Sequence, residues 1–339
     1  MNKSLYALVI VLSIVSCNDI KVNSFTVAFY NVENLFDTND DPSTYDEQFT
    51  PAGDKKWDTE KYKTKLSNLA KVISDISEGR APSFLGVCEI ENRTVLADLA
   101  AEGLLKDAHY KIAHIESPDE RGIDVAFLYD SRLFSITNQE VTQPDLSMFN
   151  DKTRDILHID GTLITGNRIH FIINHWPSRG GGQRESEPKR IQAAKALASI
   201  KDHIYSQEPE AIIIVMGDFN DEPSNNSISK TLSVSCASTA TAPKQLFNTF
   251  CDLEKQDKGS YKYRDHWDML DQIMVSKSLV SETSKLYFIT GSEAIKSDDW
   301  MQQHGNKYEG SPLRTFGGPN YLAGYSDHFP VSIQIGLRP

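Results

Sequence analysis

The sequence predicts an α/β protein in which two β-sheets pack face to face and helices cover their outer sides. Apolar runs of strand length alternate with segments of helical period, without the regular strand–helix–strand series of a parallel sheet. Thr165-Gly166-Asn167 separates two strand-like runs and is the strongest hairpin signal in the chain. No repeat of fixed period and no Pro/Gly/Ser-rich linker divides the 339 residues, so one continuous body is expected.

The expected elements follow one another along the chain. Strands are expected at residues 25–36, 83–92, 111–117, 124–130, 133–141, 156–164, 168–174, 211–220, 269–276 and 329–335. Helices are expected at residues 61–76, 93–105 and about 188–205. The first helix has one apolar stripe, formed by Leu66, Leu69, Val72, Ile73 and Ile76.

The first seventeen residues, MNKSLYALVIVLSIVSC, have the pattern of a secretory signal. The apolar run from Leu5 to Val15 is too short to span a bilayer. The ending IVSC resembles the lipobox of bacterial lipoproteins, in which the signal is cut before a cysteine that then receives lipid. We expect residues 1–16 to be a lipoprotein signal peptide, Cys17 to be lipidated and residues 17–23 to form a tether; the alternative is a plain cleaved signal. This predicts an extracytoplasmic protein that meets a bacterial membrane through its lipid only.

Three further cysteines lie in the body of the chain. Cys88, inside the apolar run FLGVCEI, is expected to be a small buried hydrophobic residue. Cys236 and Cys251 could either pair as a disulfide in an oxidising compartment or remain free.

The net charge of −12 argues against a passive nucleic-acid-binding module, which needs a basic surface. It argues less against an enzyme whose acidic pocket holds a divalent cation, because the metal supplies the missing positive charge.

Polar side chains of metal-ligand or acid/base type stand at one end of five expected strands. They occur in the segments 31–34 (NVEN), 89–92 (EIEN), 174–175 (NH), 217–220 (GDFN) and 326–328 (SDH). If these ends converge, Glu89, Asn31 and Asp327 offer the oxygen ligands that Mg²⁺ prefers. Asp218 and Asn220 are two residues apart, so both can face one side and hold a water or a phosphoryl group.

His328 needs a carboxylate to fix its tautomer, and Asp271 is the candidate, with Asp265 and Asp268 as alternatives. The set contains acid, base and metal ligands but no activated serine or cysteine nucleophile. The reaction that fits is metal-assisted attack of water on a phosphoester.

Seven segments in order, YNVENLF, CEIEN, RGIDVAFLY, NHWPSR, GDFNDEP, DMLDQI and GYSDHFPV, resemble the motifs of the endonuclease/exonuclease/phosphatase family. That family includes deoxyribonuclease I, apurinic endonucleases, inositol polyphosphate phosphatases and bacterial sphingomyelinases. The pair GDFN and SDHFPV is the most specific part of the resemblance, which covers roughly residues 24–337. It implies a four-layer α/β sandwich, with two packed mixed β-sheets flanked by helices and the site at one edge of the sheets.

The resemblance also implies roles for single residues. Asn31 and Glu89 match the metal-side asparagine and glutamate of the family, and Asp327 is a further acid near the cation. Asp218 and Asn220 match the pair that orients the attacking water and the phosphate.

Asp271 and His328 match the family's aspartate–histidine dyad, described as general base or as stabiliser of the transition state. His175 matches the histidine of deoxyribonuclease-like members and is expected to donate to a phosphate oxygen or the leaving group. In those members the histidine is supported by a glutamate, whose place Asp124 approaches with an offset of about one residue. Glu33 stands where apurinic endonucleases have an aspartate near the metal.

Other residues allow two interpretations. Arg179 is either a phosphate clamp or a solvated loop arginine, and the glycines at 180–182 either admit a ligand or give flexible linkage. Trp176 is expected to pack on the following helix rather than to stack on a base. The aromatic residues of segment 298–325 are expected to pack on the body, with a stacking surface for bases as the alternative.

Together these features predict a metal-dependent phosphodiester hydrolase, first of all an extracytoplasmic endonuclease of low sequence specificity. The expected cofactor is Mg²⁺, with Mn²⁺ as a substitute, and the expected substrate is DNA or RNA. No protein partner is implied and a monomer is expected. One alternative is a phosphatase or phospholipase-type hydrolase acting on inositol phosphates or sphingomyelin. An alternative of another class is a surface binding module without catalytic activity.

Overall fold

The computed structural model describes residues 23–338 except 239–241, 282 and 306. The predicted signal peptide at 1–16, the predicted lipid site Cys17 and most of the tether lie outside the described residues. In the part of the chain that is described, no helix combines the length and the apolar character needed to cross a membrane.

The first large sheet has the strand order β13-β17-β1-β2-β4-β3, with β14 beside β17. Its strands are β1 (Ser24–Leu35), β2 (Phe84–Ile90), β3 (Tyr110–His114), β4 (Asp124–Asp130), β13 (Leu286–Phe288), β14 (Ala294–Ile295) and β17 (Val331–Leu337). Strands β1 and β2 are parallel, and the other pairs are antiparallel.

The second large sheet has the order β5-β6-β7-β8-β12-β9. Its strands are β5 (Phe134–Thr142), β6 (Ile156–Leu163), β7 (Arg168–His175), β8 (Ile213–Asp218), β9 (Leu246–Asn248) and β12 (Asp271–Ser276). The predicted hairpin joins β6 to β7, and Gly166 occupies the left-handed position of its turn with φ 82°. Only β7 and β8 run parallel to each other, so both sheets are mixed.

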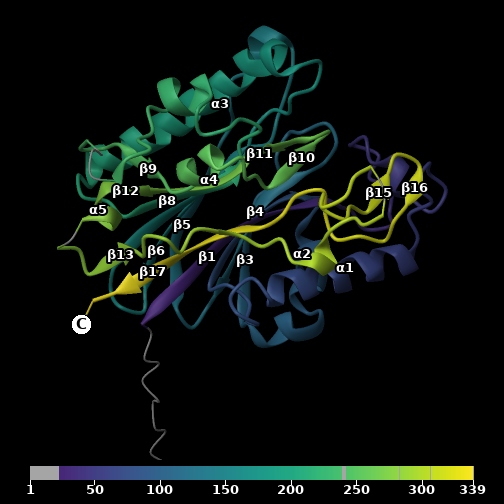
Figure 1. The fold of residues 1–339 in the computed structure, drawn as a ribbon, viewed down its shortest axis with the longest axis horizontal. Helices are drawn as coiled ribbons and strands as arrows, with labels where there is room; N and C mark the ends of the chain where they lie inside the picture. The colour runs from purple at the N-terminus through teal and green to yellow at the C-terminus, as the bar shows by residue number, and fades with distance from the viewer. Residues whose placement is uncertain (1–22, 239–241, 282, 306, 339) are drawn as a thin grey trace, which may run out of the picture.

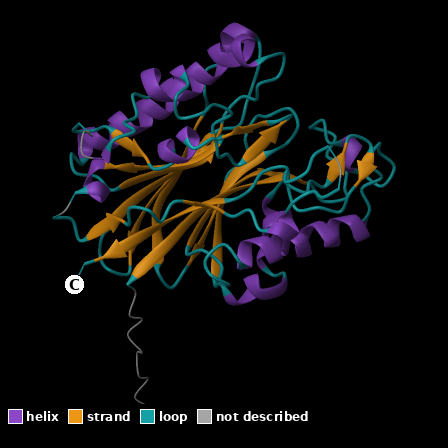
Figure 2. Ribbon diagram, viewed as in Figure 1, coloured by secondary structure: helices purple, strands orange, loops and turns teal. Residues whose placement is uncertain are grey.

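Four layers result from the burial of these elements (Figures 1 and 2). Phenylalanines from both sheets, including Phe84, Phe127 and Phe171, fill the core between them. Helix α1 (Thr59–Ser74) and helix α2 (Arg93–Ala100) cover the outer face of the first sheet, and helix α3 (Gln183–Gln207) covers the second. The apolar stripe predicted for the first helix is buried against its sheet. The predicted α/β sandwich is therefore confirmed.

Short elements decorate the sandwich. Helical turns lie at η1 (Glu47–Phe49), η2 (Gly103–Asp107), η3 (Ser147–Phe149), η4 (Ser227–Thr231), α4 (Cys251–Lys255), α5 (Lys277–Val280) and η6 (Asp299–Met301). Two small hairpins pair β10 (Tyr261–Tyr263) with β11 (His266–Asp268) and β15 (Phe316–Gly317) with β16 (Asn320–Tyr321).

Two predicted helices have different bounds. The helix expected at 93–105 ends at Ala100, and Gly103 then takes a positive φ of 50° that starts a separate turn. Helix α3 begins at Gln183, before the expected start at Pro188, and the hydroxyl of Ser186 in its first turn donates to the carbonyl of Gly182.

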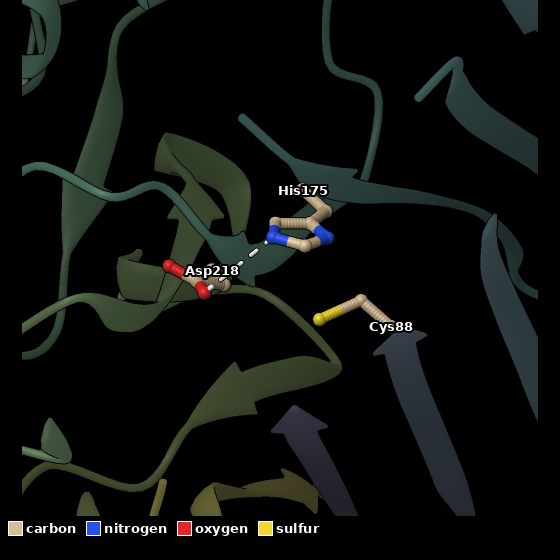
Figure 3. A group of neighbouring side chains, drawn as sticks. All are labelled: Cys88, His175 and Asp218. Carbon is tan, nitrogen blue, oxygen red and sulfur yellow. Dashed lines mark ion pairs between the residues drawn. The ribbon is translucent and has the colours of Figure 1, made fainter. Parts of the chain in front are cut away.

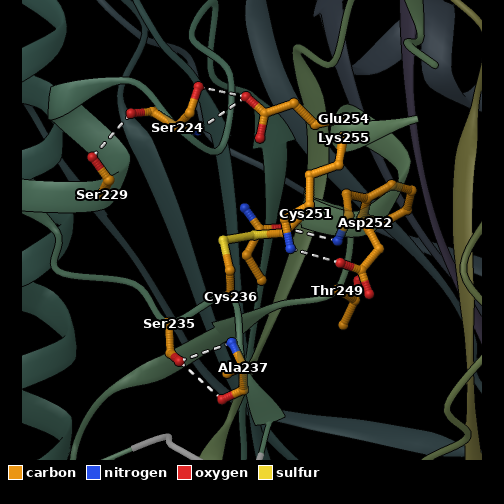
Figure 4. The surroundings of a disulfide bond; sticks show 12 residues. Ser224, Ser229, Ser235, Cys236, Ala237, Thr249, Cys251, Asp252, Glu254 and Lys255 are labelled. Atoms are coloured by element: carbon orange, nitrogen blue, oxygen red, sulfur yellow. Dashed lines mark hydrogen bonds and ion pairs between the residues drawn. A yellow bond between two sulfur atoms is a disulfide. The ribbon is translucent and has the colours of Figure 1, made fainter. Parts of the chain in front are cut away.

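A disulfide joins Cys236 to Cys251, with 5.6 Å between their Cα atoms (Figure 4). It connects the segment after η4 to the first residue of α4. Cys88 is a free, buried cysteine in the core between the sheets, as predicted.

The core between the sheets supports a first prediction. The ring of Phe171 lies 4.7 Å from that of Phe127 and 4.9 Å from that of Phe84. Phe171→Ala should lower the free energy of unfolding by about 3–5 kcal/mol, because it leaves a cavity between two sheets. Ile164→Ala, in the exposed hairpin, should change it by less than about 0.5 kcal/mol. Equal urea midpoints for the two variants would contradict this packing.

Candidate active site

The polar strand ends identified in the sequence meet at one edge of the sandwich, between the two sheets. The amide nitrogen of Asn31, on β1, donates to Glu89 Oε1 at 3.3 Å and to Asp218 Oδ2 at 3.1 Å. Glu89 belongs to the first sheet and Asp218 to the second. One buried amide therefore links the two sheets at the site.

The backbone leaves regular strand geometry where these side chains are presented. Glu33, Asn34, Glu89 and Asn220 all have positive φ, between 50° and 61°. The register of β2 against β4 shifts between Cys88 and Ile90, and the amide of Asn34 donates to Glu89 Oε2 at 3.0 Å. Positive φ is costly for residues with a Cβ, and such residues concentrate at functional sites.

Asp218 is the last residue of β8 and is held by the loop that follows it. The backbone N–H of Asn220 donates to Asp218 Oδ1 at 2.9 Å, and the Asn220 side-chain amide donates to the carbonyl of Trp176 at 3.0 Å. Asp218 Oδ2 is thereby left facing Asn31 and two histidines. His175 Nε2 and His328 Nε2 both lie 3.8 Å from it.

His328 and Asp271 form the predicted dyad. His328 Nδ1 lies 2.6 Å from Asp271 Oδ2, which also accepts a hydrogen bond from the hydroxyl of Ser260 at 2.5 Å. Burial alone would lower the pKa of His328, but the carboxylates of Asp271 and Asp218 raise it well above its ordinary value. Asp268, an alternative partner, is instead bonded to Arg179. His328 is therefore the positively charged group of the site.

His175 ends β7 directly beside Asp218 in the parallel register of β7 and β8. Its Nε2 lies 3.8 Å from Glu89 Oε1 as well as from Asp218 Oδ2. Burial, with the positive charges of Arg154 and Arg121, lowers the pKa of His175 well below its ordinary value. Its imidazole is therefore neutral, in contrast to that of His328.

Figure 3 shows His175 between the two sheets, with Asp218 on one side and the thiol of Cys88 below the ring. Burial raises the pKa of the Cys88 thiol well above its ordinary value, with the charges of Asp218 and Glu89 adding to the effect. A protonated, fully buried thiol is a poor nucleophile, so Cys88 is part of the core beneath the site.

The predicted support of His175 by Asp124 is wrong. Asp124 Oδ2 lies 2.9 Å from Nε2 of His114, and Asp124 Oδ1 accepts from the backbone N–H of Ser117 at 2.8 Å. Asp124 begins β4, whose antiparallel neighbour β3 ends at His114, so the carboxylate is taken by that strand. Within the described residues, His175 Nδ1 is buried without any hydrogen-bond partner.

Asp327 and Glu33 stand beside the site but are paired with cations. Arg314 donates to Asp327 Oδ2 at 2.5 Å and its Nε lies 3.9 Å from Glu33 Oε1. Lys65 Nζ lies 3.8 Å from Glu33 Oε2, which accepts from the backbone N–H of Thr315 at 2.7 Å. Burial and the neighbouring Asp327 raise the pKa of Glu33 to about 7. Glu33 is thus held by the protein rather than free for a ligand.

Arg179 and Trp176 serve the architecture of the site. Arg179 Nε donates to the carbonyl of Asn220 at 2.9 Å and its Nη1 to Asp268 Oδ1 at 2.7 Å, so it braces the loop after β8. Trp176 is fully buried, meets Phe219 edge to face at 4.9 Å and packs in the core beneath α3. The prediction that Trp176 packs against the helix is confirmed.

Comparison with known proteins decides the family. The profile of the Endonuclease/Exonuclease/phosphatase family matches residues 26–336. The chain belongs to this family. No curated protein sequence matches at a significant level.

Solved structures of this fold include truncated TDP2 from Caenorhabditis elegans, with 16% identity and a TM-score of 0.58 over 92% of this chain and 97% of that chain. A mannosyl-6-phosphatase from Bacteroides thetaiotaomicron has 16% identity and a TM-score of 0.55, covering 92% of this chain and 99% of that one. The human nocturnin catalytic domain with bound sulfate has 17% identity and a TM-score of 0.54, covering 94% and 97%. At these identities the likeness shows the shared fold.

Family membership places the chain among phosphoric ester hydrolases, and the site carries an acid, amide and histidine set that suits them. Asn31, Glu89, Asp218 and Asn220 offer only carboxylate and amide groups, the ligands of a hard divalent cation. Burial, followed by the charge of Asp327, raises the pKa of Glu89, and burial also raises that of Asp218. Two buried carboxylates that resist ionisation are the setting into which a divalent cation fits.

Several residues that build the site had no signal in the sequence. Ser260 reaches Asp271 through the β10–β11 hairpin, in which Tyr261 bridges to His328. Ser326, within the motif SDH, donates from its hydroxyl to the carbonyl of Asn31 at 2.7 Å, and only its place in that motif could have indicated it.

Lys65 was also missed, because it looks like a polar-face residue of an amphipathic helix. Its Nζ donates to Thr315 Oγ1 and to the carbonyl of Tyr325, both at 2.7 Å, and fastens segment 298–325 to α1. Trp300 and Tyr325 meet at 5.0 Å, with Lys71 Nζ 3.9 Å from the Trp300 ring centre. The prediction that these aromatic residues pack on the body is confirmed.

The dyad gives a second prediction. Asp271→Asn should lower kcat for bis(p-nitrophenyl) phosphate by roughly 10²–10⁴-fold, because His328 loses the carboxylate that orients and charges it. The matched change Asp265→Asn, on the exposed β10–β11 turn, should leave kcat unchanged. Equal rates for the two variants would show that His328 works without Asp271.

Proposed function

We propose that this protein is a divalent-metal-dependent phosphodiester hydrolase that acts outside the cytoplasm as an endonuclease of low sequence specificity. One observation carries the proposal: around a single oxygen, Asp218 Oδ2, lie the amide of Asn31 and the Nε2 atoms of both histidines. Metal ligands, a water-binding acid and two phosphate-side donors therefore share one small space.

Each residue then has a role that its contacts allow. Glu89 and Asn31, with Asp327 nearby, would hold Mg²⁺ or Mn²⁺, and the bound cation would neutralise the charge that builds on the phosphate. Asp218, fixed by Asn220, accepts a hydrogen bond from the water that attacks phosphorus. His328, charged by Asp271, donates to a non-bridging oxygen, and His175 faces a phosphate oxygen or the leaving group.

The charge balance of the site favours a diester over a monoester. Five carboxylates gather here, those of Glu33, Glu89, Asp218, Asp271 and Asp327. The cations that contact them are Lys65, Arg314 and His328. A diester brings one negative charge and a monoester about two, so an acidic site accommodates the diester at lower electrostatic cost. Nucleic acid is the abundant diester polymer, and readout of its bases is not needed for cleavage.

The same structure supports an extracytoplasmic location. A disulfide such as Cys236–Cys251 persists in oxidising compartments and is rare in the cytosol of most organisms. We therefore keep the proposal that residues 1–16 direct export and that Cys17 carries a lipid, so that the site faces substrates outside the cell membrane.

A substrate panel tests the function. Full-length protein in detergent is incubated with plasmid DNA, RNA, sphingomyelin, an inositol phosphate and mannose 6-phosphate, each with Mg²⁺, Mn²⁺ or EDTA. DNA and RNA should be cut at internal positions with either metal and left intact in EDTA. Asp218→Ala and His328→Ala should each lower the rate by at least about 10²-fold.

Other outcomes of this panel would replace the proposal. Cleavage of the monoesters alone would identify a phosphatase, and cleavage of sphingomyelin alone a phospholipase-type enzyme. Retention of substrate in EDTA without any turnover would identify a binding module. Undiminished activity in both variants would place the active site elsewhere.

A further inference from the structure

Two buried polar atoms near the site lack hydrogen-bond partners among the described residues: His175 Nδ1 and Asp155 Oδ1. Both residues are more than nine-tenths buried, with 4% of His175 and 8% of Asp155 exposed. An unsatisfied buried polar atom costs about 1–3 kcal/mol, so native proteins keep few of them without a reason. One atom here belongs to a ring nitrogen that can donate, and the other to a carboxylate that can only accept when ionised.

The strand register places these two residues opposite each other. Leu157 on β6 is the partner of Ile173 on β7, and the same antiparallel register, continued by two residues, brings Asp155 across from His175. Leu157 and Ile173 both point into the core between the sheets, whereas Ile156 and Ile172 point to the α3 side. Because side chains alternate along a strand, Asp155 and His175 share the inner face. Opposed residues of this kind have Cβ atoms about 5 Å apart.

The other acids near His175 are committed elsewhere. Asp124 is bonded to His114 and to the backbone of Ser117. Glu89 and Asp218 approach Nε2 of the ring, not Nδ1. Asp155 is therefore the acid that the register places beside Nδ1.

We propose that Asp155 is the positioning residue of His175: its carboxylate accepts a hydrogen bond from Nδ1–H and directs Nε2 at the substrate phosphate. The role in turnover rests on the proposed function, whereas the contact itself does not. A carboxylate on Nδ1 fixes both the orientation and the tautomer of an imidazole.

The electrostatics of the pair fit this role. Burial and the positive charges of Arg154 and Arg121 disfavour the imidazolium form of His175. An ionised Asp155 favours that form and so allows Nε2 to carry the proton that a phosphate oxygen or leaving group receives. Burial, with the charge of Asp124, raises the pKa of Asp155 only to about 6, which leaves it largely ionised at neutral pH.

Kinetics of the full-length protein on plasmid DNA test the role in turnover. Asp155→Asn should lower kcat by about 10–100-fold with KM changed by less than about threefold, because the substrate still binds but its donor is misaligned. Asp124→Asn is the matched control, since it changes an equally buried acid of the same edge that serves His114, and it should leave kcat within about threefold. In a His175→Ala background, Asp155→Asn should cause no further loss. A multiplicative loss there, or an equal loss in Asp124→Asn, would overturn the proposal.

A measurement without substrate tests the contact and stays informative if the proposed function fails. In ¹⁵N-histidine-labelled protein, long-range ¹H–¹⁵N spectra should show His175 protonated at Nδ1. In Asp155→Ala this signature should shift toward the Nε2–H tautomer, while the signals of His114 and His328 stay in place. Asp155→Asn serves the same comparison if the alanine variant does not fold. An unchanged His175 tautomer would overturn the proposal even if kcat falls.

Discussion

The structure depends on one constraint: several carboxylates are buried where two sheets meet, and each must be offset by something. The amide of Asn31 provides part of that offset, because it donates to Glu89 in one sheet and Asp218 in the other. The backbone accepts positive φ at Glu33, Asn34, Glu89 and Asn220 to bring such groups together. The site is thus also the seam that fixes how the two sheets face each other at this edge.

The acids of the site divide by how their charge is offset. Glu33 and Asp327 are paired with Lys65 and Arg314, which come from α1 and from the segment fastened to it. Asp271 is offset by His328 and by the hydroxyl of Ser260. Glu89 has no cation within ion-pair distance except His175, whose imidazole is neutral. The fold therefore leaves Glu89 as the acid best placed to receive an added cation, with Asp218 alongside.

Much of this could be predicted from the sequence because the relevant signals are local. Apolar runs set the strands, Gly166 set the hairpin, and polar residues at strand ends named Asn31, Glu89 and Asp218 before their positions were known. The contacts that could not be predicted join distant segments. Lys65 meets Thr315 across 250 residues, and Ser260 reaches Asp271 through an unpredicted hairpin. Asp124 was assigned to the wrong histidine because the sequence does not show which strand lies beside β4.

The central claim is that Glu89 is buried for the sake of a divalent cation, and thermal unfolding with and without Mg²⁺ tests it most directly. Without metal, Glu89→Gln should be at least as stable as the natural protein, because it removes a buried charge that lacks a strong partner. Saturating Mg²⁺ should raise the Tm of the natural protein, since a ligand that binds only the folded state stabilises it, and should leave that of Glu89→Gln unchanged. An equal rise of Tm in both proteins would contradict the account.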